Sequence, residues 1–194
     1  MAPAPPLTPL GYALLGLVHQ QPRSGYDLRR LFEATPMAYF SSSPGAIYPA
    51  LDRLERGGLV VGTVDARQPL RPRKVYEITP TGVETLRAWV TKPVVHEDLV
   101  RRDGELDLRF AFLGGIGGLA DSRRFLESLV TEIDAEVRSL ERHLAAMKAT
   151  ATLHGRLALE SGIELYKARA RWARRALRHF ETGARRGPRH GRKP

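Results

Sequence analysis

The residues best suited to chemistry lie in one stretch, residues 42–60, where polar side chains alternate with apolar ones at helical spacing. Ile47, Leu51 and Leu54 recur at four and three residues, which predicts one buried stripe on a short helix. The other faces carry groups that can bond phosphate oxygens or base edges, namely Ser43, Tyr48, Asp52, Arg53 and Arg56. The stretch therefore predicts a helix with one polar binding face.

Both ends of this helix are marked. Ser42 or Ser43 is a candidate N-cap, because a hydroxyl can accept an otherwise unpaired amide of the first turn. Gly57-Gly58 can supply the positive φ that ends a helix. Pro49 removes one backbone hydrogen bond, at a cost of about 3 kcal/mol inside a helix. We therefore expect the helix to begin late, near residues 45–46.

Composition narrows the class of protein. The chain has 194 residues, of which 7% are aromatic, and this fits one small domain with an appendage. The formal net charge of +10 favours polyanionic partners, either nucleic acid or an anionic membrane surface. There is no cysteine, which excludes disulfides, thiolate zinc sites and cysteine nucleophiles.

The cellular location is predicted from what the segments lack. Residues 1–6 are proline-rich and have neither the basic start nor the apolar run of a signal peptide. No apolar run approaches the roughly 20 residues that span a bilayer. We expect a soluble, cytoplasmic protein with no membrane partner.

Further helices and strands are expected around the opening stretch. Thr8-Pro9 starts a helix that ends near residues 20–22, and Ser24 with Asp27 forms a capping-box pattern for a second helix. Strand-like runs cover residues 59–64 and 74–78. A helix followed by such a pair of strands predicts a mainly α (α+β) fold, with an N-terminal winged helix-turn-helix.

The loop between the two strands is basic, with Arg67, Arg71 and Arg73 beside two prolines. Such a tip can lie along a phosphate backbone. The alternative is a solvated turn whose charges keep the protein soluble. Thr79-Pro80 then caps one more helix, which Pro93 closes.

Four motifs follow one another between residues 8 and 92. They are Leu14-Leu15-Gly16-Leu17-Val18, Ser24-Gly25-Tyr26-Asp27-Leu28, the whole of residues 45–60, and Tyr76-Glu77-Ile78-Thr79-Pro80-Thr81-Gly82. In this order they resemble the PadR family of bacterial transcriptional regulators. The resemblance implies a winged helix-turn-helix that binds operator DNA as a homodimer, usually repressing a gene until a small molecule or other signal releases it.

The resemblance also implies DNA-binding residues. Those of the recognition helix are Ser42, Ser43, Gly45, Tyr48, Pro49 and Arg53, those of the wing are Arg67, Arg71, Arg73 and Lys74, and Tyr26 lies on the preceding helix. The wing cations suit phosphate contacts, whereas the polar groups of the helix can reach base edges. Two alternatives remain open. In the first, the rings of Tyr26 and Tyr48 pack against the protein and barely contact DNA. In the second, Arg53 forms an ion pair with a neighbouring acid, Asp52 or Glu55, instead of contacting DNA.

The C-terminal half predicts dimerisation. Apolar residues recur at fours and threes over residues 125–147 and 159–180, which predicts two long amphipathic helices joined near residues 149–154. One bent helix is the alternative. A pair this long cannot bury both stripes alone, so a second subunit is the simplest cover. Twofold symmetry would then set two recognition helices about 34 Å apart, one turn of duplex.

The predicted organisation is therefore a winged helix-turn-helix over residues 8–93, a helical dimerisation region over 94–183 and a basic, disordered tail over 184–194. Large aromatic side chains are candidates for an apolar effector pocket at the dimer centre, although ordinary packing is the alternative for each. They are Trp89, Phe110, Phe112, Tyr166 and Trp172.

No enzymatic signature stands out. The glycines of residues 113–118 lack the Lys-Ser/Thr ending of a phosphate loop and predict a helix break. His96-Glu97-Asp98 has no second histidine at helical spacing, so no metal and no cofactor are expected. We expect a DNA-binding repressor without catalytic activity. The alternative is a helical protein-protein interaction module whose winged domain does not bind specific DNA.

Overall fold

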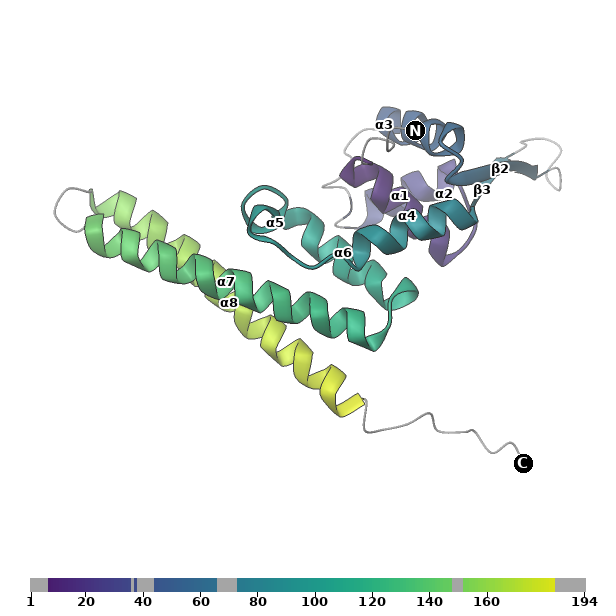
Figure 1. The fold of residues 1–194 in the computed structure, drawn as a ribbon. Coiled ribbons are helices and arrows are strands. Elements are labelled where there is room, and N and C mark those ends of the chain that lie inside the picture. The colour runs from purple at the N-terminus through teal and green to yellow at the C-terminus, as the bar shows by residue number, and fades with distance from the viewer. Residues whose placement is uncertain (1–6, 36, 38–43, 66–72, 148–151, 184–194) are drawn as a thin grey trace, which may run out of the picture. The chain divides into compact units, whose positions relative to one another are not determined.

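The computed structural model describes residues 7–35, 37, 44–65, 73–147 and 152–183. The chain divides between Val90 and Thr91 into two compact units (Figure 1). The first unit holds α1 to α4 and a small sheet, and the second holds α5 to α8.

Helix α1, Pro9–Gln20, forms the centre of the first unit. The Thr8 hydroxyl accepts a hydrogen bond from the Gly11 amide at 3.2 Å, as the predicted cap requires. Nearly all of the helix from Leu10 to Val18 is buried, because α1 packs against α3, α4 and β3. Helix α1 is therefore buried on several sides.

Helices α2, Gly25–Ala34, and α3, Pro44–Arg56, pack against each other. The predicted capping box is present, since the Ser24 hydroxyl accepts from the Asp27 amide at 3.1 Å while the Asp27 carboxylate accepts from the Ser24 amide at 3.4 Å. Helix α3 begins one residue before the expected range. Pro49 consequently lies at the start of its second turn.

The sheet has three antiparallel strands in the order β1-β3-β2. Strands β2, Val60–Asp65, and β3, Arg73–Ile78, form the predicted hairpin, in which Val60 pairs with Ile78. The sequence analysis missed β1, Arg23–Ser24, because two residues are too short to show alternation. Figure 1 shows the hairpin extending from the helices of the first unit.

Two glycines have structural roles around the hairpin, Gly58 in the turn after α3 and Gly82 in the contact between α4 and the hairpin. Gly58 has a φ of 68°, the left-handed conformation that the sequence predicted for the end of α3. At Gly82, in the first turn of α4, a Cβ would overlap the carbonyl oxygen of Leu59 and lie 2.7 Å from a side-chain carbon of Ile78. Only glycine therefore lets α4 pack this closely against the hairpin.

Helix α4, Pro80–Val90, completes the first unit. The Thr79 hydroxyl accepts from the Gly82 amide at 3.0 Å, so the predicted cap is confirmed. Near its end Trp89 stacks on Tyr12 of α1, with ring centroids 4.2 Å apart and planes 3° from parallel. Three helices, a β hairpin and a closing helix form a winged helix-turn-helix, as predicted.

All regular secondary structure in the described part of the second unit is helical. Helices α5, His96–Arg101, and α6, Asp103–Ile116, are followed by two long helices, α7, Leu119–Met147, and α8, Leu153–Gly183. Helix α6 ends at Gly117, so the predicted helix break is confirmed. Helices α7 and α8 lie side by side and antiparallel (Figure 1), and ion pairs such as Lys167–Glu141 at 2.9 Å join them. The interpretation as one bent helix is wrong.

The apolar stripes of α7 and α8 face each other. Ile133 of α7 and Ile163 and Ala173 of α8 are all nearly inaccessible. Other residues of the two stripes, among them Val137, Leu144 and Leu177, are only partly buried within one chain, so their cover by a second subunit stays a prediction. The large apolar side chains left exposed on α8 lie elsewhere, and they include Leu157, 51% exposed, and Leu165, 71% exposed.

An ion pair that the sequence analysis missed lies in the second unit. Arg109 of α6 is buried and donates to the Asp98 carboxylate of α5 at 3.3 Å and to the carbonyl oxygen of Lys92. Burial lowers the pKa of Arg109, and the nearby Asp98 carboxylate opposes that shift. Asp98 thus serves as a structural anion.

Every helix in the described part of the chain is too short or too polar to form a membrane span.

Candidate nucleic-acid interface

Helix α3 has one buried and one exposed side. Ile47, Leu51 and Leu54 are at most 2% exposed, so the predicted apolar stripe is confirmed. The opposite side is exposed and carries Gly45, Tyr48, Pro49, Asp52, Arg53 and Arg56. On a helical projection Asp52 and Arg56 lie near the middle of this surface, while Tyr48 and Arg53 lie on its two flanks. We call this surface the outer face of α3.

The Tyr48 flank borders a polar cavity of about 440 Å³ that also involves β3. It is lined by Ser24, Gly25, Tyr26, Tyr48, Arg73, Lys74 and Tyr76. The Tyr48 ring lies against the backbone of Gly25, where an added Cβ would come within 2.7 Å of the ring. Tyr48 nevertheless remains 46% exposed, so its ring both packs on α2 and faces solvent. Three predicted site residues besides Tyr48, namely Tyr26, Arg73 and Lys74, thus meet at one cavity.

Tyr26 lies between two guanidinium groups. Its ring centroid is 5.5 Å from Arg29 Cζ and 5.3 Å from Arg73 Cζ. Contacts of this kind orient an arginine without occupying its hydrogen-bond donors. Arg29 was missed by the sequence analysis, although its spacing of three residues from Tyr26 on a helix places the two side chains on one face.

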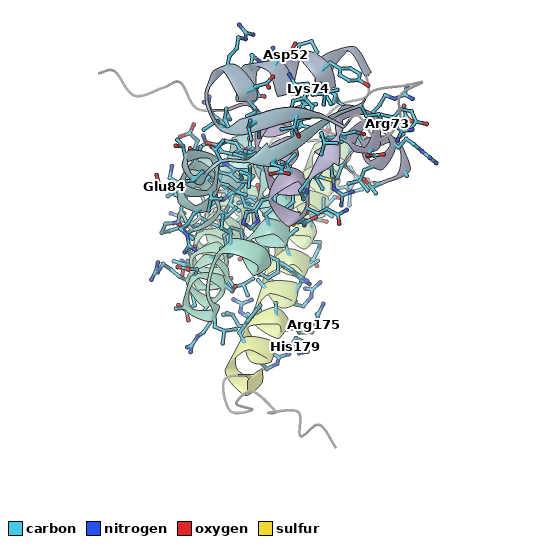
Figure 2. The ribbon with its side chains drawn as sticks, turned by 90° about the vertical axis from the view of Figure 1, so that its right-hand side faces the viewer. Asp52, Arg73, Lys74, Glu84, Arg175 and His179 are labelled. Carbon is cyan, nitrogen blue, oxygen red and sulfur yellow. The ribbon has the colours of Figure 1, made fainter. Side chains whose placement is uncertain are left out.

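Lys74 is held by an acid of α3. Its ammonium donates to Glu55 Oε2 at 2.6 Å, and Glu55 Oε1 accepts from the Gly62 amide of β2 at 3.2 Å. The hydrogen bond with Lys74 lowers the pKa of Glu55, and the same bond raises the pKa of Lys74. Glu55 therefore joins α3 to both strands of the wing. In Figure 2, Asp52 of α3 and Arg73 and Lys74 of β3 are labelled on this unit.

Arg53 lies on the other flank of α3. The alternative in which it pairs with Asp52 or Glu55 is not found, since Glu55 binds Lys74 and the described residues offer Arg53 no ion pair. Arg56 donates from Nε to the carbonyl oxygen of Asp52 at 3.3 Å, which leaves its terminal nitrogens at the surface. Asp52 and Arg56 were named in the polar face of the helix but not among the predicted site residues.

Four predicted DNA-binding residues lie outside the described residues, namely Ser42, Ser43, Arg67 and Arg71.

The predicted effector residues fall in both units. Phe110 and Trp172 make an edge-to-face contact with centroids 5.4 Å apart in the second unit, where burial raises the pKa of the half-buried Tyr166. Trp89 belongs to the first unit. The joint pocket stays a prediction.

Residues 14–88 match the model of the transcriptional regulator PadR-like family. The chain carries a PadR-like transcriptional-regulator domain. The predicted resemblance is thereby confirmed, and the PadR-like domain covers α3, the wing and the Tyr48 cavity. Residues 108–181, in the second unit, match the model of the virulence activator alpha C-terminal region.

Two proteins similar to this chain are named as transcriptional regulators. A probable transcriptional regulator from Mycobacterium tuberculosis is 27% identical, over 84% of this chain and 93% of the relative. The negative transcriptional regulator PadR from Bacillus subtilis is 29% identical, over 43% of this chain and 46% of that protein. A crystal structure of Bacillus subtilis PadR with operator DNA is 21% identical, covers 88% of this chain and 97% of the other, and has a TM-score of 0.43.

Proposed function

We propose that the chain is a homodimeric, sequence-specific DNA-binding repressor that acts in the cytoplasm and is released by a small hydrophobic or aromatic effector or another signal. The observation that carries the proposal is the placement of the outer face of α3 beside the cations of β3, within a PadR-like domain. No step of this function requires catalysis.

The chemistry of the outer face supports major-groove binding. Helix α3 has 13 residues and is about 20 Å long, and an α-helix about 10–12 Å in diameter fits a major groove about 12 Å wide. Tyr48, Asp52 and Arg56 are exposed and carry donors and acceptors that suit base edges or phosphates. Arg53 stays a predicted readout residue on the flank of this face.

The wing side supports phosphate binding. Arg73 is exposed and oriented by Tyr26, and its guanidinium can donate two hydrogen bonds to one phosphate. Lys74 adds a second cation at the same cavity. Contacts of this kind fix orientation on the duplex without reading its sequence.

Dimerisation and repression are proposed on separate grounds. The exposed leucines of α8 include Leu157 and Leu165, whose apolar side chains a second copy can cover. Repression is favoured by the name of the Bacillus subtilis relative, a negative transcriptional regulator. The aromatic contacts of Phe110 and Trp172 offer surface for a hydrophobic or aromatic effector.

Fluorescence anisotropy with two labelled duplexes tests the proposal. One duplex carries the sequence upstream of the protein's own gene, and the other is a scrambled duplex of equal composition. We expect tighter binding of the first at every salt concentration, with a linear fall of log K against log salt. Equal affinity for both duplexes, or no binding at low salt, would contradict the proposal and favour the protein-protein interaction module.

A further inference from the structure

The positive charge of the chain is concentrated near its C-terminus. Residues 167–194 hold eleven lysines and arginines and one acid, whereas residues 1–166 hold twenty lysines and arginines and twenty acids. The whole formal net charge of +10 thus comes from the second half of α8 and the sequence that follows it. A polyanion attracted by this charge is drawn to α8 as well as to the winged helix-turn-helix.

Part of this charge serves packing inside the second unit. Lys167 and Arg174 pair with Glu141 and Asp134 of α7, and Arg169 pairs with two aspartates of α6. These three cations join α8 to its neighbouring helices. They already have acidic partners within one chain.

Three further arginines of α8 form an exposed row. Arg171, Arg175 and Arg178 follow one another at spacings of four and three residues, which places them within about 60° of one another around the helix. Among the described residues, neither Arg171 nor Arg175 has an acidic partner. Figure 2 labels Arg175 on this part of α8, together with the exposed His179. We call the three residues the arginine row of α8.

The stability of the helix does not explain the arginine row. Cations stabilise a helix in its last turn, where the macrodipole acts, and the last turn of α8 contains no basic residue. Like charges at a spacing of four residues, such as Arg171 and Arg175, instead repel each other and weaken a helix. An anionic partner would relieve this repulsion.

The dimensions of the row suit duplex DNA. From Arg171 to Arg178 it extends about 10 Å along the helix axis. One strand of duplex DNA presents a phosphate about every 3.4 Å along its axis, so the row can meet about three phosphates. Each guanidinium can donate two hydrogen bonds to a phosphate.

A membrane surface suits the row less well. A helix that lies on a membrane needs an apolar face open to the lipid beside its cations. The apolar side of this part of α8 is buried within the second unit, where Ala170 and Ala173 are at most 2% exposed. The row therefore favours a partner that is bound through charge alone.

We propose that the arginine row of α8 is a second DNA-binding surface, which holds duplex DNA by its phosphates and reads no sequence. The surface lies in the second unit, outside the PadR-like domain. It adds affinity to the proposed function but does not depend on the reading of bases by α3. The leucines proposed for the dimer contact, Leu157 and Leu165, lie in an earlier part of α8.

Salt titrations by anisotropy test the row on both the upstream and the scrambled duplex. Arg171→Gln, Arg175→Gln and Arg178→Gln, combined in one chain, should lower the slope of log K against log salt by about 2.7 on both duplexes, because three phosphate contacts are lost. The ratio of the two affinities should not change. The matched control replaces three exposed arginines of α7 with Gln, namely Arg123, Arg138 and Arg142. Equal slopes for the two triple variants overturn the proposal.

Directed cleavage tests the contact itself. The chain has no cysteine, so Ala168→Cys places a single thiol about one turn before the row, at an exposed position. His154→Cys, also exposed, places a thiol on the same helix about 25 Å before the row. With iron-EDTA attached, the first variant should cleave the scrambled duplex several-fold more than the second. Equal cleavage, or no cleavage by the first, overturns the proposal.

Two further measurements separate the other partners of the row. Vesicles of equal parts phosphatidylserine and phosphatidylcholine test a membrane surface, and sedimentation velocity tests a second copy of the chain. Loss of vesicle binding in the α8 triple variant, or its dissociation to monomer, overturns the proposal if its salt slope for DNA stays that of the wild type. Equal affinity of the wild type for both duplexes would count against the proposed function, and the slopes on the scrambled duplex would still decide the row.

Discussion

At the scale of single residues, Glu55 and Lys74 determine which cations of the wing are free. Lys74 donates to Glu55 at 2.6 Å, whereas Arg73 contacts only the Tyr26 ring among the interactions described for it. In the free protein Arg73 is thus the more available of these two cations, both of which we propose to bind phosphate. Lys74 must exchange the Glu55 carboxylate for a phosphate before it can contact DNA.

Replacing Glu55 with Gln should therefore release Lys74. We expect Glu55→Gln to bind all duplexes more tightly and to steepen the slope of log K against log salt by about 0.9, because one more phosphate contact forms. Salt titrations by anisotropy measure this slope. Glu84→Gln removes an exposed charge from α4 (Figure 2) and is the control for net charge alone. Equal slopes for the two variants would mean that Lys74 does not bind phosphate.

The same pair makes stability depend on pH. The pKa of Glu55 is lowered from its ordinary value of 4.5, so its contribution is present above pH 4.5 and lost as pH falls through the lowered pKa. The pKa of Lys74 is raised from 10.5, so its contribution is full below pH 10.5 and lost as pH rises through the raised pKa. The free energies of unfolding in urea of the wild type and of Glu55→Gln should differ between these two pH limits. Beyond the limits the two free energies should converge. A constant difference down to pH 2.5 would contradict this prediction.

Tyr26 is predicted to act through Arg73. Tyr26→Leu removes the ring and should weaken DNA binding a few-fold, because a contact of this type at an exposed site is worth about 0.5–1 kcal/mol. Tyr26→Phe keeps the ring and should bind DNA like the wild type, and anisotropy compares the two. Equal loss in both variants would instead point to a direct contact by the Tyr26 hydroxyl.

At the scale of elements, the close packing of α4 on the hairpin depends on Gly82. A Cβ at this position would overlap Leu59 backbone, and the backbone cannot move away as a flexible side chain could. The wing is thus held at its base by α4 and along β2 by Glu55. Both contacts fix the angle between the hairpin and α3.

Gly82→Ala should accordingly destabilise the first unit by about 1–3 kcal/mol. Gly114→Ala is the matched control, because a Cβ there meets nothing within 4 Å and the helical position should gain about 0.5–1 kcal/mol. Urea denaturation followed by circular dichroism measures both changes. Destabilisation by Gly114→Ala, or tolerance of Gly82→Ala, would contradict the packing described here.

Much of this fold was predictable because the signals are local. Caps at Thr8 and Thr79, the capping box at Ser24 and the left-handed Gly58 all follow from residue types next to one another. The pairing of β1 with β3 was not predictable, since it brings together residues distant in sequence. For the same reason the sequence suggested that Glu55 pairs with Arg53, its near neighbour. In the structure the hairpin brings Lys74 to Glu55, and these two residues form the ion pair.

At the scale of the whole molecule, the proposed dimer rests on α8. The interface that we propose includes the exposed leucines of this helix. Leu157→Gln combined with Leu165→Gln should weaken self-association about tenfold or more for each leucine, since burying one is worth about 1.5–3 kcal/mol. Sedimentation velocity measures the change. Leu119→Gln, an exposed leucine of α7, is the control, and an unchanged dimer in the double variant would remove this surface from the interface.

The central claim is that two copies of the outer face of α3 read one duplex together. Hydroxyl-radical footprinting on the sequence upstream of the gene tests this claim most directly. The account predicts two protected half-sites with centres about 10 base pairs, or 34 Å, apart, or a multiple of that spacing. A single protected half-site at saturating protein, or uniform protection along the duplex, would contradict it.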